Sequence, residues 1–307
     1  MSRWILKQVC AAVVLACSAR SAAAAEAASQ RLIDMHFHVS PDEMQTGLPR
    51  APTPENIEVY RSFASRLAHE NVVKVVACGP RDYVLALARE APTRVMGSPF
   101  FPYPFNQESW PDLDQLRADY QSGRMGAMGE IVAQLWGLAP DDPKLEPYFA
   151  LAEELDIPVG YHVGLAPHGV NFPGTYIYAP RYRMKLSDPL LLEEVLMRHP
   201  RLRLYVMHAG WPMIDQMLGL LHTYPQVYAE LAWLDNLAPR EYQGYIRRLV
   251  EAGYGKRLMF GSDAGPDNWP GNARAAFNKL DFLSEQERDD ILYNNAARFL
   301  RLSGAAR

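Results

Sequence analysis

Two histidines separated by one residue follow an apolar run near the start of the chain, in Asp34-Met35-His36-Phe37-His38. Alternate residues of a β-strand point to the same side. If this run is a strand, His36 and His38 project together and can bind one cation, and imidazole nitrogens suit a borderline-soft ion such as zinc. A His-x-His pair also occurs by chance, so the metal hypothesis needs partners elsewhere in the chain.

Three more polar residues occupy equivalent places, each directly after an apolar run: His162, His208 and Asp263. One such histidine is usually a hydrogen-bonded core residue. With His36 and His38, however, four of the eight histidines stand at the ends of apolar runs, which favours a shared cavity. Imidazoles and a carboxylate in one cavity suit a divalent metal and acid–base chemistry.

The elements that must position these side chains are short apolar runs alternating with segments of helical period. This alternation predicts βα units and a parallel sheet buried on both faces. We expect eight strands, at Leu32–Met35, Val72–Ala77, Arg94–Ser98, Gly126–Glu130, Ile157–His162, Leu204–His208, Val227–Leu231 and Leu258–Asp263. Eight βα units are typical of a single-domain α/β (β/α)8 TIM barrel, and such a barrel gathers its strand ends at one C-terminal mouth. The predicted metal site lies at that mouth.

Composition bounds the classes of protein that the chain can belong to. Its 307 residues are 49% hydrophobic and 21% charged, which indicates a globular domain with a large core and excludes disordered and fibrous proteins. The formal net charge is −4. A sequence-independent grip on nucleic acid needs a basic face, so we expect no nucleic-acid partner.

Residues 1–25 have the features of an export signal. Arg3 and Lys7 precede an apolar run, Val9–Cys17, and small residues follow. That run is too short to span a bilayer. We therefore expect a cleaved signal peptide and a mature domain, 26–307, that is periplasmic or secreted and is not held in a membrane.

The cysteines bear on export and on disulfide bonding. Val14–Cys17 loosely resembles a lipoprotein box, so lipid-anchored export is the alternative to a soluble product. Cys10 and Cys17 would leave with the signal peptide, and Cys78 would then be alone. No intrachain disulfide is expected. Since no histidine pairs with Cys78 by sequence, the residue is interpreted as a small core side chain.

The order of these motifs resembles the amidohydrolase superfamily of metal-dependent barrels, in particular the branch related to aminocarboxymuconate-semialdehyde decarboxylase. The resemblance extends from about Leu32 to Leu300. It is carried by the motifs Asp34 to His38, His162 to Gly164, His208 to Pro212, Gly261 to Asp263 and Asn295 to Leu300.

The resemblance implies that His36, His38, His162 and Asp263 bind a divalent metal, and that His208 acts catalytically beside it. Zn²⁺ is the first expectation, with Mn²⁺ or another divalent ion as the alternative. A bound dication acidifies water, and Asp263 can both bind the metal and shuttle the water proton. His208 could polarise a carbonyl or stabilise an oxyanion.

Glu130 ends the fourth expected strand and leaves the number of ions open. Some branches of the superfamily bridge two metals with a carboxylate at this place. If Glu130 bridges, His162 and His208 would serve the second ion. The decarboxylase-like branch commonly does not use this residue as a ligand, so one ion is favoured and two are the alternative.

Substrate contacts are expected around the mouth, where apolar walls and a few polar anchors typically form a pocket. The longest irregular stretch, Val163 to Ser187, is either a binding loop or a surface cover, and its basic residues hint at an anionic substrate. Trp269 and Tyr103 are weighed as further contacts or as packing. The predicted substrate-binding residues are Arg81, Trp136, Arg181, Arg183, Trp211 and Trp233.

These observations predict an exported metal-dependent hydrolase that acts on the ester, lactone or amide carbonyl of a small molecule, carboxylated or aromatic. The alternative keeps the metal but decarboxylates or hydrates an unsaturated or aromatic acid; His36 with His38 leans slightly towards hydrolysis. A third interpretation is a barrel that binds a ligand or stores metal without catalysis, which has no need for acid–base groups. A homodimer is the assembly that relatives of this kind suggest.

Overall fold

The computed structural model describes residues 30–39, 51–102, 110–164, 166–175 and 177–303. The expected signal peptide, residues 1–25, lies outside the described residues, as do Tyr103 and Tyr176. A strand lies at each of the predicted places: β1 (Leu32–His38), β2 (Val72–Gly79), β3 (Val95–Pro99), β4 (Met128–Ile131), β5 (Val159–His162), β6 (Leu204–Met207), β7 (Tyr228–Glu230) and β8 (Leu258–Met259).

All paired strands are parallel, in the order β1-β2-β3 and β4-β5-β6-β7-β8. Isolated bridges join these two sheets on both sides, between Phe101 and Ile131 and between Phe37 and Ala264. At the second bridge, the His38 backbone N–H donates to the Ala264 carbonyl over 2.9 Å. The strands therefore close into the predicted (β/α)8 barrel.

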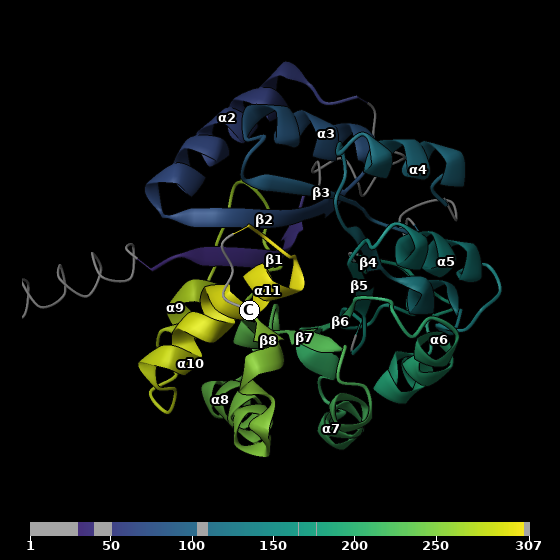
Figure 1. Ribbon diagram of the computed structural model, residues 1–307, viewed down its shortest axis with the longest axis vertical. Helices are drawn as coiled ribbons and strands as arrows, with labels where there is room; N and C mark the ends of the chain where they lie inside the picture. The colour runs from purple at the N-terminus through teal and green to yellow at the C-terminus, as the bar shows by residue number, and fades with distance from the viewer. Residues whose placement is uncertain (1–29, 40–50, 103–109, 165, 176, 304–307) are drawn as a thin grey trace, which may run out of the picture.

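Helices surround the strands (Figure 1). Two of the helix starts carry capping boxes, in which Thr53 and Ser284 accept a backbone N–H from the third helical residue. Across the described residues, no helix has the length and apolarity that crossing a membrane requires. The helices are α2 (Pro54–His69), α3 (Arg81–Glu90), α4 (Leu113–Gln121), α5 (Glu146–Glu154), α6 (Glu193–Arg198), α7 (Ile214–Thr223), α8 (Pro239–Leu249), α9 (Ala273–Phe277), α10 (Glu285–Asp289) and α11 (Asn295–Phe299).

The eighth strand is shorter than predicted, because the chain leaves the sheet ladder after Met259. The backbone N–H groups of Ser262 and Asp263 both donate to the His36 carbonyl, over 3.2 and 2.9 Å. This turn across the end of β1 brings Asp263 beside the two histidines of that strand.

Apolar side chains fill the interior of the barrel on the side of α11. Met35, Met207 and Met259 form a buried cluster with residues of α11, and Figure 1 shows α11 lying over the centre of the strands. The predicted polar residues are left at the opposite end, the C-terminal mouth, where a barrel places its active site.

Candidate metal centre

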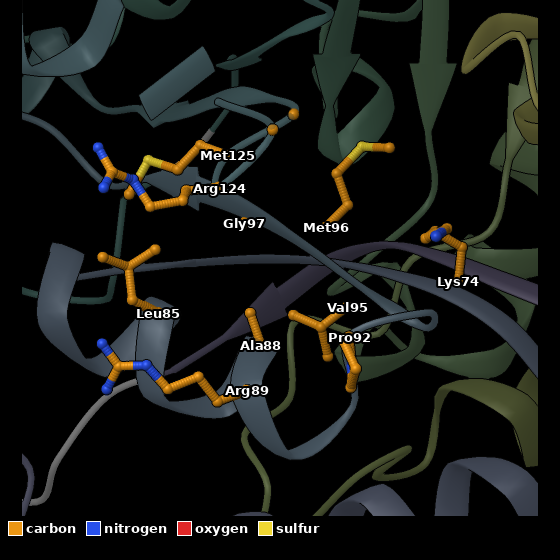
Figure 2. A pocket seen from close by; sticks show the side chains of 12 residues that line it. Lys74, Leu85, Ala88, Arg89, Pro92, Val95, Met96, Gly97, Arg124 and Met125 are labelled. Atoms are coloured by element: carbon orange, nitrogen blue, oxygen red, sulfur yellow. The ribbon is translucent and has the colours of Figure 1, made fainter. Parts of the chain in front are cut away.

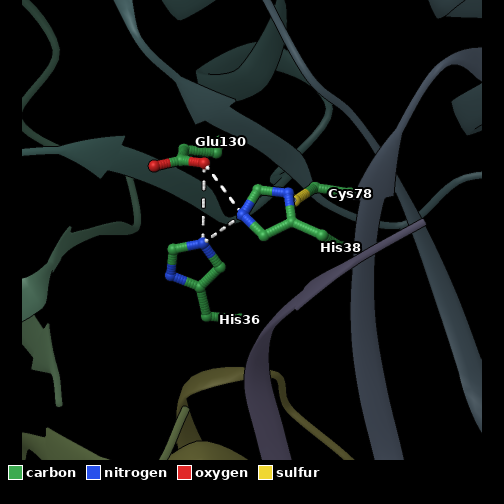
Figure 3. Close-up of side chains that lie close together, drawn as sticks. All are labelled: His36, His38, Cys78 and Glu130. Carbon is green, nitrogen blue, oxygen red and sulfur yellow. Dashed lines mark hydrogen bonds and ion pairs between the residues drawn. The ribbon is translucent and has the colours of Figure 1, made fainter. Parts of the chain in front are cut away.

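His36 and His38 lie at the end of β1 with their side chains on the same side, as strand alternation predicts. Their Nε2 atoms are 3.1 Å apart. His36 is fully buried and His38 is partly exposed. In Figure 3 the Nε2 atoms of both rings face the Glu130 carboxylate.

Two carboxylates complete a group of four donor atoms with these imidazoles. Glu130 Oε2 lies 3.5 Å from His36 Nε2 and 3.3 Å from His38 Nε2. Asp263 Oδ1 lies 3.5 and 2.9 Å from the same two nitrogens. Ligands bound at about 2.0–2.2 Å in a tetrahedral or octahedral shell are themselves about 3.0–3.5 Å apart. Each carboxylate oxygen is therefore placed to share one divalent ion with the two imidazoles.

The other oxygen of Glu130 faces a second pair of histidines. Glu130 Oε1 contacts His162 Nδ1 and lies 3.6 Å from His208 Nε2. The two imidazole nitrogens are 3.2 Å apart. Glu130, His162 and His208 are thus a further group of donors close enough to share an ion, and His208 also lies close enough to share one with His36 and Asp263.

This arrangement has the geometry of the alternative in which Glu130 bridges two ions. Glu130 lies beside His36 and His38, and His162 lies across its carboxylate with His208. Binding of a single ion by His162 together with His36, His38 and Asp263 stays a prediction. A glycine supports the position of Glu130: Gly129 has a φ of +113°, and a Cβ there would collide with the Gly160 carbonyl. β4 can therefore approach β5, the strand that carries His162.

Glu230 of β7 orients His36, and sequence reasoning missed it. His36 Nδ1–H donates to Glu230 Oε2 over 3.0 Å, and both side chains are fully buried. This bond leaves the lone pair of Nε2 directed at the four-donor group. Gly261 makes room for the carboxylate, since a Cβ there would lie 2.6 Å from its carboxyl carbon. The available signal was a lone carboxylate within the apolar run of the seventh strand.

The tautomer of neutral His208 is fixed in the same way. Its Nδ1 lies 3.1 Å from the Ala232 carbonyl, which can only accept, so Nδ1 carries the proton. Nε2 is then a lone pair facing Glu130 and His162. This geometry suits a metal ligand, and the predicted catalytic role of His208 beside the metal stays a prediction.

Asp34 supports the motif without reaching the donors. It accepts hydrogen bonds from the His36 N–H, the Ser262 N–H and the Trp269 indole N–H, over 3.1, 3.0 and 2.7 Å. Burial raises the pKa of Asp34 to about 6, although these bonds oppose the shift. Trp269, weighed above as a substrate contact, is instead buried packing that holds the first and eighth strand ends together.

Cys78 of β2 is buried, as expected of a core side chain, but it does have a histidine partner. Its Sγ lies 3.4 Å from His38 Nδ1. Figure 3 shows the thiol on the side of the His38 ring away from Glu130. The sequence interpretation that no histidine pairs with this cysteine was wrong, because the pairing joins neighbouring strands.

The charges of the site compensate one another. Burial alone would lower the pKa of His36, but the carboxylates of Asp263 and Glu130 raise it well above its ordinary value. Burial alone would raise the pKa of Glu130, but His36 and His162 hold it well below the ordinary range. For Asp263, His36 and His38 likewise overcome burial and lower the pKa to about 2. Both carboxylates therefore stay ionised and favour a cation between them.

Left-handed backbone occurs at the same end of the barrel, as it also does outside the site at Asn71, Asp156 and Arg301. His208, Trp233 and Asp263 have φ values of 57°, 68° and 53°. Such left-handed conformations are uncommon for residues other than glycine and cluster at functional sites.

Two of the predicted substrate-binding arginines are engaged elsewhere. Arg81 makes a bidentate pair with Asp119 of α4, with N···O distances of 2.7 and 2.8 Å. Arg183 donates to the carbonyls of Pro180 and Tyr182 in its own loop. Both guanidinium groups thus have partners within the protein, and their contact with a substrate carboxylate stays a prediction.

The tryptophans that were predicted to contact substrate form two separate packing arrangements. Trp211 and Trp233 have ring centroids 5.8 Å apart, and the Trp211 indole N–H donates to Glu241 over 3.2 Å. Trp136 lies under the Arg181 guanidinium, 4.5 Å from carbon to ring centroid. Direct substrate contact by these residues stays a prediction.

Comparisons with known proteins agree with this fold. A family model described as amidohydrolase matches residues 33–302. No curated protein sequence matches the chain significantly. A protein described as a "probable 2-pyrone-4,6-dicarboxylic acid hydrolase" from Acinetobacter baumannii, with citric acid bound, is 18% identical with a TM-score of 0.60, over 88% of this chain and 99% of that chain.

Two further solved structures are similar. The 4-oxalomesaconate hydratase from Rhodopseudomonas palustris is 12% identical with a TM-score of 0.57, over 88% of this chain and 95% of that chain. A 2,6-dihydroxybenzoate decarboxylase in complex with 2,6-dihydroxybenzoate is 13% identical with a TM-score of 0.55, over 90% of this chain and 99% of that chain. At these identities, the likeness concerns the fold.

Proposed function

This chain belongs to the amidohydrolase family, and we propose that it is a metal-dependent hydrolase that adds water to the ester, lactone or amide carbonyl of a small carboxylated molecule. The observation that carries the proposal is the group of four donor atoms from His36, His38, Glu130 and Asp263, with nitrogen–oxygen distances of 2.9 to 3.5 Å. Hydrolases of pyrone dicarboxylates share the fold.

We assign two divalent ions to this mouth, since Glu130 turns one oxygen to each pair of histidines. His36, His38 and Asp263 would hold one ion, His162 and His208 the other, and Glu130 would bridge them. Zn²⁺ suits these nitrogen and oxygen donors. Bound ions would polarise the carbonyl and lower the pKa of water.

The protein's own groups would orient the histidine rings and transfer the proton of the attacking water. Glu230 and the Ala232 carbonyl fix the rings of His36 and His208, so that their lone pairs face the site. Asp263 directs Oδ1 at His38, which leaves Oδ2 to accept a proton from the attacking water. The new bond joins the water oxygen to the carbonyl carbon. The C–O or C–N bond then breaks, and Asp263 returns the proton to the leaving atom.

The test is product analysis with the protein reconstituted with Zn²⁺ or Mn²⁺. The panel contains 2-pyrone-4,6-dicarboxylate, a simple aryl ester, an aryl amide and 2,6-dihydroxybenzoate. We expect incorporation of ¹⁸O from water into an acid product. Asp263→Asn should lose at least about 10²-fold in rate, because a positioned acid–base group is removed. Asp267→Asn, at an exposed acid nearby, should keep full activity.

The same assay also distinguishes hydrolysis from the alternative functions. Carbon dioxide release from 2,6-dihydroxybenzoate without ¹⁸O incorporation would replace hydrolysis by decarboxylation, the reaction named for one structural neighbour. A metal-loaded protein silent towards the whole panel would contradict both and favour a binding barrel. An active Asp263→Asn variant would contradict the assigned proton transfer.

A further inference from the structure

A small group of buried residues lies under the loop that follows β5. This loop cluster consists of Val132, Leu135, Val170, Ala179 and Tyr182. Phe100 and Trp136 pack against it. The Phe100 ring also meets the His38 ring edge to face, with centroids 5.7 Å apart. The loop cluster therefore lies next to the metal centre.

Polar atoms at this place are buried without hydrogen-bond partners. Gln134 is fully buried, and among the described residues neither its amide oxygen nor its amide nitrogen has a partner. The same holds for Trp136 Nε1 and Ser187 Oγ. Gln134 and Trp136 belong to the short helical turn η2 (Ala133–Trp136), which contacts the turn η3 (Met184–Ser187).

Such groups are rare in native proteins because a buried, unpaired polar group costs free energy. A bridging water would satisfy them, but a water needs a cavity with polar walls, and these atoms expose less than 1 Å² each. Departures from the rule that buried polar groups are hydrogen-bonded typically occur at functional sites. The unpaired atoms thus indicate a ligand that is bound when the loop segment 177–187 has moved off η2.

The chemistry of the unpaired atoms points to an oxygen-rich group. The amide N–H groups of Gln134, the indole N–H of Trp136 and the hydroxyl of Ser187 are all donors. Arg181 adds positive charge directly over the Trp136 ring, 4.5 Å from its centroid. These donors, on two contacting turns and beside a guanidinium, suit a carboxylate, although the Gln134 amide oxygen is an acceptor and would gain no partner from it.

We propose that Gln134, with Trp136 and Ser187, forms a subsite for a carboxylate of the substrate remote from the reacting carbonyl. Gln134 stands four residues after Glu130, so the subsite and the metal centre share one strand end. This inference rests on the proposed function, because it assigns a feature of the substrate of that site. It makes Gln134 a specificity residue.

A matched control exists on β5. The Tyr161 hydroxyl is also buried without a partner among the described residues. Its ring lies 6.3 Å from Phe149 of α5, between the barrel and its outer helices. Removing this hydroxyl changes the same kind of unpaired group at a place where no substrate can reach.

The experiment measures binding and melting temperature in metal-reconstituted protein. The probe is isophthalate, a dicarboxylate without a scissile bond, and isophthalamide is its neutral counterpart. Gln134→Met keeps the side-chain shape but removes the amide. We expect Gln134→Met to weaken isophthalate binding about tenfold or more and to raise Tm. Tyr161→Phe should raise Tm and leave binding unchanged.

Some results would contradict the subsite itself, and another would contradict only the assignment of a carboxylate to it. Isophthalate binding that is unaffected by Gln134→Met, or that Tyr161→Phe weakens equally, contradicts the subsite. Wild-type protein that binds isophthalate no more tightly than isophthalamide contradicts the carboxylate assignment. Neither measurement requires turnover, so failure of the hydrolase assay with this binding pattern intact would count against the proposed reaction alone.

Discussion

The charged side chains at the mouth of the barrel differ in burial and in partners from those in a groove at the other end. Figure 2 shows the groove, a cavity of about 470 Å³ between α3, β3 and the connection before β4. Its basic side chains are Lys74, Arg89 and Arg124. Lys74 donates to the Thr93 carbonyl over 2.7 Å, and Arg124 pairs with a carboxylate. At the mouth, by contrast, His36 and Glu230 are fully buried against each other.

The difference teaches that neither volume nor charge alone marks a reactive site. Arg89 keeps its charge exposed to water, which costs little and orients nothing. A buried ionised group must be compensated, so each charge at the mouth fixes the position of another. That mutual fixing provides the preorganisation which catalysis requires.

The largest expected effect comes from removing the donors at the mouth. His36→Ala combined with His38→Ala should lower kcat/KM by at least about 10³-fold, because metal polarisation worth several kcal/mol is lost. Steady-state kinetics and elemental analysis would measure this, with circular dichroism to show that the fold is kept. Wild-type rates in the double variant would mean that the buried charges are structural.

A smaller effect is expected from the residue that orients one donor. Glu230→Gln removes the charge that His36 Nδ1–H meets, and we expect metal affinity to fall about 10- to 100-fold. A competition titration with a chelator measures it. Unchanged affinity would show that His36 needs no such support.

The buried Asp119 carboxylate and its two partly exposed arginine partners near the groove should affect stability without affecting chemistry. Burial alone would raise the pKa of Asp119, but Arg81 and Arg124 hold it below its ordinary value. Asp119→Asn should therefore cost about 2 kcal/mol of unfolding free energy at neutral pH. Because the folded pKa is lowered, this stabilisation is present above the ordinary carboxyl pKa of about 4 and is lost as the pH falls below it. Urea unfolding at neutral and acidic pH would contradict the account if the difference did not shrink in acid.

The smallest effect is expected from the groove itself. Arg89→Ala removes an exposed charge there, so the unfolding free energy should change by no more than about 0.5 kcal/mol. The rate should stay at the wild-type value. A tenfold loss of activity in this variant would contradict the division between the two ends of the barrel.

Local patterns in the sequence were enough to predict the barrel and the places of its strands. Each strand is an apolar run, and the parallel order follows from the intervening helices. His36 and His38 could be placed on one side because strand alternation is a local property. The hydrogen bonds of the Thr53 and Ser284 caps are local in the same sense, since their partners lie three residues away.

Contacts between distant strands could not be predicted in this way. Glu230 reaches His36 across the barrel, and Cys78 reaches His38 from the neighbouring strand. The grouping of His162 with His208 depends on the direction in which Glu130 points. Likewise, nothing local in the sequence predicts that Arg81 pairs with Asp119.

The most direct test of the central claim is the metal content of the purified protein, compared with a His162→Ala/His208→Ala variant. The account predicts close to two divalent ions per chain in the wild type and close to one in the variant, since only the second pair of histidines is removed. One ion in the wild type, retained in the variant, would contradict the bridging role of Glu130. Absence of bound metal from both proteins after reconstitution would contradict the metal centre itself.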